Sequence, residues 1–162
     1  MRFRGVFVSF ATAALIAAPA FAQDFFASVA GARAECSIRG TAADDTLYGT
    51  TRDDVICSKA GSDTVYGDEG DDSIRLGQSH DSGYGGEGSD GVKGQDDDDL
   101  VYGGGMNDKV YGGQGNDSVY GEGGDDFVKV HDNVSNNDNA DGGPNTDTCY
   151  VDSGDVATAC EA

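Results

Sequence analysis

Aspartate recurs at a fixed interval of nine residues through the middle of the chain. Ten consecutive nine-residue copies run from Gly40 to Lys129, and the sixth position of every copy is aspartate. The ten residues are Asp45, Asp54, Asp63, Asp72, Asp81, Asp90, Asp99, Asp108, Asp117 and Asp126. Regularly spaced carboxylates can bind metal ions, and calcium takes about six to eight hard oxygens from carboxylates and backbone carbonyls. A turn with one Asp supplies half of such a site, so we expect the next turn on the same side to supply the rest.

The other positions of the repeat show which elements must hold these aspartates. Two residues after each Asp the chain places Leu47, Ile56, Val65, Ile74, Gly83, Val92, Val101, Val110, Val119 and Val128. One nine-residue unit cannot bury its aliphatic residue alone, so a fixed period predicts a stacked solenoid. We expect the aliphatic side chain to point inward and its two neighbours to point outward, as in a strand. Glycine in the first half of each copy suits a tight turn.

The unit resembles G-G-x-G-x-D-x-U-x, the RTX (repeats-in-toxin, or hemolysin-type) calcium-binding nonapeptide. Residues 85–93 and 112–120 follow that pattern well. The resemblance implies that the first six residues form a metal-binding turn and the last three a short strand. It also implies an all-β fold, a right-handed parallel β-roll with two repeats per coil, in which copies 18 residues apart stack on the same side. Several Ca²⁺ ions would be held by the ten aspartates, in roughly eight sites between turns, four on each side.

Several copies depart from this pattern. The fourth position is Arg52 in one copy and Met106 in another. Both side chains disfavour the positive φ of a tight turn, so we expect them to weaken their turns. The copy at 76–84 departs most, because Gly83 replaces its aliphatic residue. We therefore expect the roll to be loosest there, and we interpret His80 as an exposed turn residue rather than a metal ligand.

The nine-residue period is interrupted after Lys129. We therefore predict that residues 36–130 form the β-roll with its N-terminal cap. Residues 131–141 are rich in Asn and Asp, and we interpret them as a polar loop. Part of this segment is faintly similar to an EF-hand loop, but it lacks the leading Asp, the closing Glu and the flanking helices. Residues 142–150 form an eleventh, imperfect repeat with Asp147 in register. We therefore predict a C-terminal cap with a degenerate repeat at 142–162.

The first 22 residues have the layout of an export signal. Two arginines precede an apolar run from Val6 to Ala18, and Ala20 and Ala22 supply the small residues that a signal peptidase requires. The run is too short to span a membrane, and a buried N-terminal helix is the weaker alternative. We predict a signal peptide at 1–22 that is removed near Ala22, a linker at 23–35, and a secreted, extracellular protein.

Four cysteines in an exported chain indicate two disulfides, with three pairings to choose from. They are Cys36, Cys57, Cys149 and Cys160. Local pairing would hold the two open ends of the solenoid, where unpaired strand edges are exposed. A zinc site is the alternative, and the absence of C-x-x-C spacing argues against it.

The charge of the chain excludes several classes of function. The formal net charge is −20, and removal of a signal with two arginines and no acid makes it −22. Such a chain repels nucleic acid and anionic lipid, so we expect neither as a partner. Composition alone would also suit a disordered chain, but the regular period argues against disorder. No enzyme is predicted, because His80 and His131 have no adjacent nucleophile motif and the glycine-rich stretches contain no GK[ST].

The ninth position of the repeat gives the two outer faces different character. One face is predicted to carry Tyr48, Tyr66, Tyr84, Tyr102 and Tyr120, and the other Cys57, Arg75, Lys93, Tyr111 and Lys129. An aromatic ladder either stabilises a sheet or binds a partner such as a cell-surface polysaccharide or protein. We predict a calcium-binding structural or adhesive protein of the cell surface or matrix. The alternatives are a calcium-dependent polysaccharide-binding module and a non-catalytic accessory to a secreted enzyme.

Overall fold

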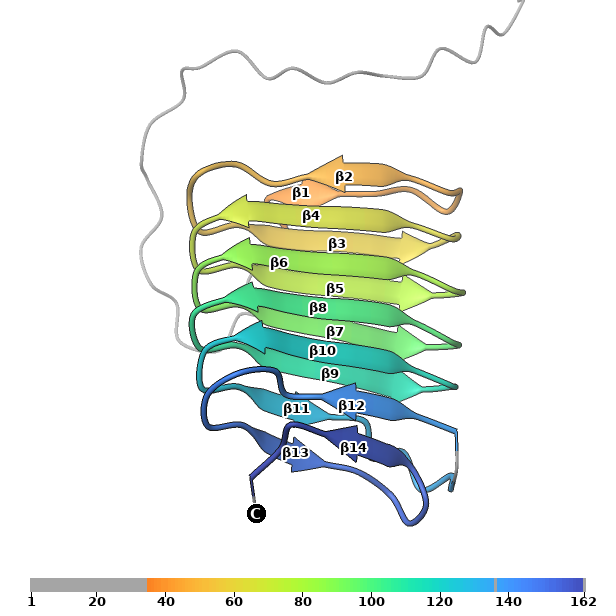
Figure 1. Cartoon of the computed structure of the whole chain (residues 1–162). Coiled ribbons are helices and arrows are strands. Elements are labelled where there is room, and N and C mark those ends of the chain that lie inside the picture. The colour runs from red at the N-terminus through yellow and green to blue at the C-terminus, as the bar shows by residue number, and fades with distance from the viewer. Residues whose placement is uncertain (1–34, 136, 162) are drawn as a thin grey trace, which may run out of the picture. The chain divides into compact units, whose positions relative to one another are not determined.

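The computed structural model describes residues 35–135 and 137–161, and these residues form a parallel β-solenoid with two sheets and no helix (Figure 1). The odd sheet consists of β1 (Ile38–Arg39), β3 (Val55–Ala60), β5 (Ser73–Gln78), β7 (Gly91–Asp96), β9 (Lys109–Gln114), β11 (Phe127–Lys129) and β13 (Thr148–Tyr150). The even sheet consists of β2 (Thr46–Tyr48), β4 (Thr64–Glu69), β6 (Ser82–Glu87), β8 (Leu100–Gly105), β10 (Ser118–Gly123), β12 (Asn139–Asp141) and β14 (Val156–Thr158).

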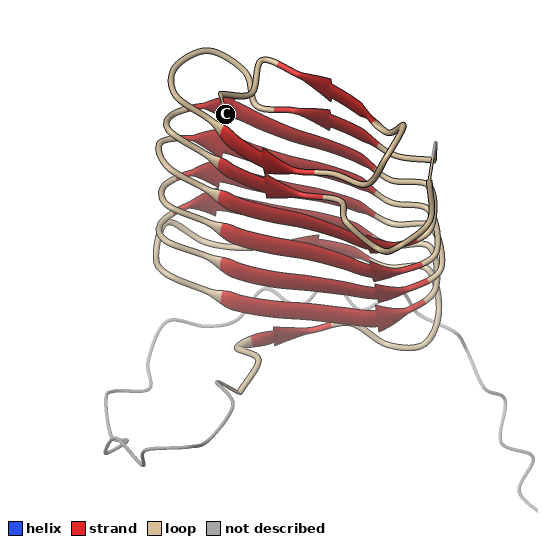
Figure 2. Cartoon of the chain, turned by 90° about the horizontal axis from the view of Figure 1, so that it is seen from below, coloured by secondary structure: helices blue, strands red, loops and turns tan. Residues whose placement is uncertain are grey.

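Consecutive strands alternate between the two sheets, so two repeats complete one coil (Figure 2). Strand neighbours within a sheet are parallel. From β1 to β11 they are 18 residues apart, as Val65 opposite Gly83 and Val92 opposite Val110 show. Every repeat position therefore stacks on the same position one coil away. The predicted all-β, parallel β-roll fold with two repeats per coil is confirmed.

The full-length strands are twice as long as the resemblance implied. A strand such as β4 covers repeat positions seven to nine and continues through the first three positions of the next copy. Only positions four to six are left for the turn. The first three positions of the repeat thus pair in register with the same positions of the coils above and below, as Asp68 with Gly86 and Gly86 with Gly104 show.

The core is a double column of aliphatic side chains between the sheets. The eighth-position residues from Ile56 to Val128 are fully buried. The copy at 76–84 is not a packing defect, contrary to expectation. A β-carbon added to Gly83 would lie 2.9 Å from Cδ1 of Leu76, whose side chain is fully buried. Leu76 stands at the first position of the copy and fills the space that Gly83 leaves.

The turns need positive φ at the fourth position in most copies. Glycine provides it at Gly61, Gly70, Gly88, Gly115 and Gly124. Met106 takes the same conformation, with φ of 78°, so its turn is strained as expected. Arg52 does not adopt positive φ, and the strain expected there is absent.

The predicted polar loop at 131–141 ends in a strand. Residues 139–141 form β12, which pairs with β10 and places the buried Ala140 opposite Val119. Eight residues, 130–137, separate the ninth repeat position from Asp138, where five are usual. The stack continues beyond this three-residue insertion through β13 and β14.

Both disulfides join cysteines that are close in the sequence. Cys36 pairs with Cys57 and ties β1 to β3 at the first rung, while Cys149 pairs with Cys160 at the last. The structure thereby selects one of the three pairings and excludes a zinc site at these residues. The predicted signal peptide at 1–22 and nearly all of the linker at 23–35 lie outside the described residues. Within the described part, no helix has the length and apolarity to cross a membrane.

Candidate functional site

The repeated aspartates form two columns, one along each edge of the roll. Each Asp ends a turn directly before a strand, and strand register places it beside the Asp 18 residues away. One column contains Asp45, Asp63, Asp81, Asp99, Asp117 and Asp138. The other contains Asp54, Asp72, Asp90, Asp108, Asp126 and Asp147. All ten of the predicted site residues are brought together in this way, five on each side.

A hydrogen bond links each aspartate to the next one in its column. The backbone N–H of Asp63, for example, donates to Oδ1 of Asp81, and that of Asp72 donates to Oδ1 of Asp90, both at 2.7 Å. The equivalent bonds along both columns measure 2.7 to 2.9 Å. Each bond fixes one carboxylate oxygen and turns the other toward the interior of the turn.

The second oxygen of these carboxylates is buried and has no hydrogen-bond partner in the protein. This holds for Oδ2 of Asp63, Asp72, Asp81, Asp90, Asp99, Asp108, Asp117, Asp126, Asp138 and Asp147. None of these ten side chains is more than 4 % exposed. A buried carboxylate oxygen without a donor is costly, and it calls for a proton or a cation.

Burial makes several of these carboxyl groups weaker acids by raising their pKa. It raises the pKa of Asp99 to about 8 and that of Asp108 to about 7, although the backbone N–H bond opposes the shift in both. Burial likewise raises the pKa of Asp72, Asp81 and Asp117 to about 6. Carboxylates of neighbouring turns add repulsion at each of these five groups. A positive charge between the turns would favour the ionised carboxylates and so offset both causes of the shift.

The glycines at the first repeat position leave space where a carboxylate oxygen and a backbone carbonyl oxygen approach each other. A β-carbon added to Gly103 would lie 2.6 Å from Oδ2 of Asp108 and 2.7 Å from the carbonyl oxygen of Gly121, one coil further along. At Gly67 the corresponding distances are 2.3 Å to Oδ2 of Asp72 and 2.2 Å to the Gly85 carbonyl oxygen. At these two positions a carboxylate oxygen of one turn and a carbonyl oxygen of the next therefore converge on a space that the glycine leaves open.

A second set of contacts ties the turns together at the fifth repeat position. Here the direction is reversed, because the N–H of the later coil donates to the side chain of the earlier one. The Ser89 N–H donates to Oδ1 of Asp71, and the Asn116 N–H donates to Oδ1 of Asp98. These side chains are exposed, so they add negative charge at the rim of each turn.

Sequence reasoning missed Asp138 and did not count Asp147 among the site residues. The Asp117 N–H donates to Oδ1 of Asp138 at 2.7 Å, and the Asp126 N–H donates to Oδ1 of Asp147 at 2.8 Å. Both pairs are 21 residues apart instead of 18, because of the three-residue insertion. The signal was present as Asp138-Asn139-Ala140, which matches the Asp-x-aliphatic part of the repeat once the insertion is allowed. Glu161 then ends one column by accepting the N–H of Asp147 at 2.6 Å.

The donor set fits calcium and draws on the backbone. No three His, Cys, Asp or Glu side chains converge on one point within the described residues, as they would in a centre built from side chains alone. Each turn instead offers one buried carboxylate oxygen beside carbonyl oxygens, which are hard ligands that suit Ca²⁺. A bound calcium ion would supply the positive charge that the facing carboxylates lack.

The two histidines lie apart from this arrangement. Nδ1 of His80 lies 3.2 Å from the backbone nitrogen of Asp98, and the side chain is exposed in its turn, as expected. His131 lies 2.5 Å from Oδ1 of Asp152 near the C-terminal end. Neither histidine is placed to bind an ion within the aspartate columns.

Comparison with known families gives a match over most of the solenoid. A family model for the RTX calcium-binding nonapeptide repeat, in four copies, matches residues 39–56, 58–92 and 93–128. No curated protein and no solved structure gives a significant match to the chain. The family match covers the coils that hold the ten predicted aspartates, and it stops before the insertion.

Proposed function

Because the chain belongs to the RTX calcium-binding nonapeptide repeat family, we propose that it is secreted, folds when it binds calcium, and has a structural or adhesive role at the cell surface or in the matrix. The ions would be held between consecutive turns of each column. Their ligands would be the ten repeated aspartates together with Asp138 and Asp147, supplemented by backbone carbonyl oxygens.

The observation that carries this proposal is the double column of buried carboxylate oxygens without a protein donor. At neutral pH the calcium-free roll would have to bury charges that repel one another, or keep protons on groups that are ionised in the unfolded chain. Either cost opposes folding. Bound calcium removes this cost, so the free energy of calcium binding contributes to the free energy of folding.

Two features support a location outside the cell. Both disulfides hold open ends of the solenoid, and disulfides persist in oxidising compartments. Extracellular calcium is also abundant enough for sites of modest affinity to fill.

Circular dichroism in chelator and in calcium tests the proposal. We expect a largely disordered spectrum in chelator and a β spectrum as calcium rises from submillimolar to millimolar concentration. Magnesium at equal concentration is the control, because Mg²⁺ prefers an octahedral shell that keeps its own waters. A β spectrum in chelator at pH 7.5 would refute folding on calcium.

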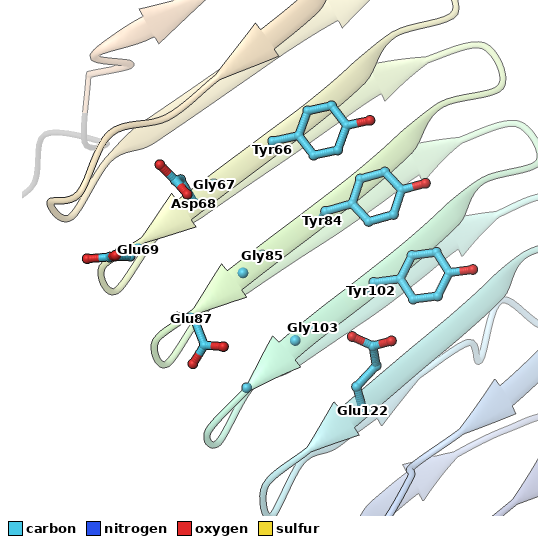
Figure 3. Close-up of a pocket in the computed structure, with 13 residues that line it drawn as sticks. Tyr66, Gly67, Asp68, Glu69, Tyr84, Gly85, Glu87, Tyr102, Gly103 and Glu122 are labelled. Atoms are coloured by element: carbon cyan, nitrogen blue, oxygen red, sulfur yellow. The ribbon is translucent and has the colours of Figure 1, made fainter.

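A calcium-dependent polysaccharide-binding module is the second candidate, and a groove on the even sheet favours it. The groove lies between a tyrosine ladder and acidic side chains, over a glycine floor (Figure 3). The ladder itself is confirmed: neighbouring rings of Tyr48, Tyr66, Tyr84, Tyr102 and Tyr120 stack with centroids 4.8 to 5.2 Å apart. The rings cover one another's faces, so sugars would meet ring edges and hydroxyls. Glycan-array binding by the Tyr84→Ser, Tyr102→Ser double variant, compared with the unchanged protein in calcium, tests this candidate.

A further inference from the structure

The two outer faces of the roll carry opposite charge. Of the seven Lys and Arg residues in the described part, six lie in strands of the odd sheet, and the even-sheet strands contain none. We call the outward-facing group on the odd sheet the basic face: Arg39, Arg75, Lys93, Lys109 and Lys129. The even-sheet strands carry five acids, which we call the acidic face: Asp68, Glu69, Glu87, Glu122 and Asp141. In a chain of net charge −20, such a separation needs an explanation.

Neither set of charges is neutralised within the roll. The ion pair found in the described part joins His131 to Asp152, and no Lys or Arg there pairs with a carboxylate. Lys93 and Lys109 are exposed, and the Lys93 ammonium lies over the Tyr111 ring at 5.2 Å. Glu87 and Glu122 are exposed on the opposite sheet. Both faces are therefore available to a partner.

The acidic face is shaped to accept protruding side chains. Figure 3 shows Tyr66, Tyr84 and Tyr102 along one side of the groove, and Glu87 and Glu122 along the other. The floor consists of glycines without side chains. A lysine or arginine entering this groove would meet carboxylates on one wall and tyrosine hydroxyls and ring edges on the other.

The two faces also share one spacing. Rungs of both sheets are one parallel-strand separation apart, about 4.8 Å, and the tyrosine centroids on the even sheet repeat at 4.8 to 5.2 Å. Cations on β5, β7, β9 and β11 of one roll can therefore lie opposite acids of another, which are found on β4, β6, β10 and β12 but not on β8. An unrelated partner would have to match this period, whereas a second copy has it already.

We propose that calcium-loaded copies of this chain associate face to face, with the basic face of one copy on the acidic face of the next. The contact joins two different surfaces, so each pair leaves one basic face and one acidic face free, and addition of further copies builds an open chain. Such a chain would be a direct physical basis for a structural role. The inference rests on the proposed function, because only the calcium-folded roll presents these faces.

The size of the faces and the net charge set the conditions for this contact. Each sheet has four strands of six residues and shorter strands at its ends, so a face extends at most about 20 by 29 Å and a pair would bury at most about 1,200 Å² in total. That area is at the low end for a specific interface, so we expect weak association, in the micromolar range or above. A charge of −20 repels other copies unless bound calcium cancels most of it, so association should require calcium and weaken in high salt.

Charge reversal on one face at a time tests the proposal. Lys93→Glu with Lys109→Glu leaves the basic face with three cations and two acids, while Glu87→Lys with Glu122→Lys leaves the acidic face with three acids and two cations, so each variant has one face nearly neutralised. Sedimentation velocity in calcium at low ionic strength should show concentration-dependent assembly of the unchanged protein and monomers for each variant alone. An equimolar mixture of the two variants should form pairs, because the first variant keeps its acidic face and the second keeps its basic face.

Arg52→Glu is the matched control for Lys93→Glu as a single substitution, because it changes the net charge equally but lies in a turn away from both faces. Assembly should weaken in Lys93→Glu and persist in Arg52→Glu. Circular dichroism in calcium shows separately whether each variant folds. A folded but monomeric protein at several hundred micromolar, or a mixture of variants that stays monomeric, overturns the inference alone. Binding of a polyanion such as a polyuronate to the basic face without self-association also overturns it. Failure to fold in calcium overturns the proposed function and the inference together.

Discussion

A methyl group added to a first-position glycine should disable one ion site and leave the sheet intact. We choose Gly103, whose added β-carbon would lie 2.6 Å from Oδ2 of Asp108 and 2.7 Å from the Gly121 carbonyl oxygen. Contacts this short require the carboxylate or the neighbouring strand to move. Either movement separates the two oxygens that converge on the proposed site.

Two contributions give the expected size of the effect. Overpacking of a tight site costs about 1–3 kcal/mol. Loss of an ion that was present at ten times its dissociation constant removes about 1.4 kcal/mol of further stability. Gly103→Ala should therefore lower the free energy of unfolding in calcium by about 2–4 kcal/mol, which corresponds to roughly 10 °C in the thermal midpoint.

Gly91→Ala is the matched control, because its β-carbon would meet a single atom, the Asp72 carbonyl oxygen, at an ordinary 3.8 Å. This variant should keep its calcium affinity and gain up to about 1 kcal/mol, since alanine restricts the unfolded chain. Thermal unfolding and calcium titration by circular dichroism measure both variants. Equal midpoints and equal calcium affinities for the two would refute the assignment of the glycine space to the ion.

Three further predictions follow from the same geometry. Burial raises the pKa of Asp99 to about 8, so without calcium the folded roll holds protons that the unfolded chain releases near pH 4. The stability that this protonation gives to the calcium-free roll is greatest below pH 4 and is lost as the pH rises through 8. β structure should therefore appear on acidification in calcium-stripped buffer. A pH-independent spectrum would contradict this. Asp90→Ala should release ions from the two sites on its own side and none from the other, as calorimetric ion counting can show; losses on both sides would argue against the 18-residue stacking. Met106→Gly should raise stability by about 1 kcal/mol by removing positive-φ strain, whereas Arg52→Gly should lower it; equal thermal shifts would contradict the assignment of strain.

The nine-residue period was sufficient to predict the fold, because it determines both the strand spacing and the inward side chain. Val65, Val92 and Val101 are buried as their positions in the repeat require. Strand length was not predictable from the same pattern. Glycine at positions one to three is typical of turns, yet these positions pair as strand with the same positions of the neighbouring coils, as Asp68 with Gly86 and Gly86 with Gly104 show.

The sequence pattern also does not show that two positions of one repeat can compensate for each other in core packing. The eighth position taken alone predicts a gap in the core at Gly83. The side chain of the first position also points inward. From Gly40 to Gly121 this position is glycine or serine in all copies except the one that begins with Leu76. Leu76 is the one large residue there, and it occurs in the same copy as Gly83. Pairwise packing, rather than position-specific preference, decides that region.

The aspartate columns are closed at both ends by donors and acceptors of the protein itself, which limits where ions are needed. In the first coil, the N–H and hydroxyl of Thr41 donate to Oδ2 of Asp45, and those of Thr50 do the same for Asp54. These two oxygens are satisfied without a cation. At the other end Glu161 accepts the N–H of Asp147, where a further repeat aspartate would otherwise stand. The carboxylate oxygens without donors thus lie only between these ends, where one coil faces another and where calcium can join them.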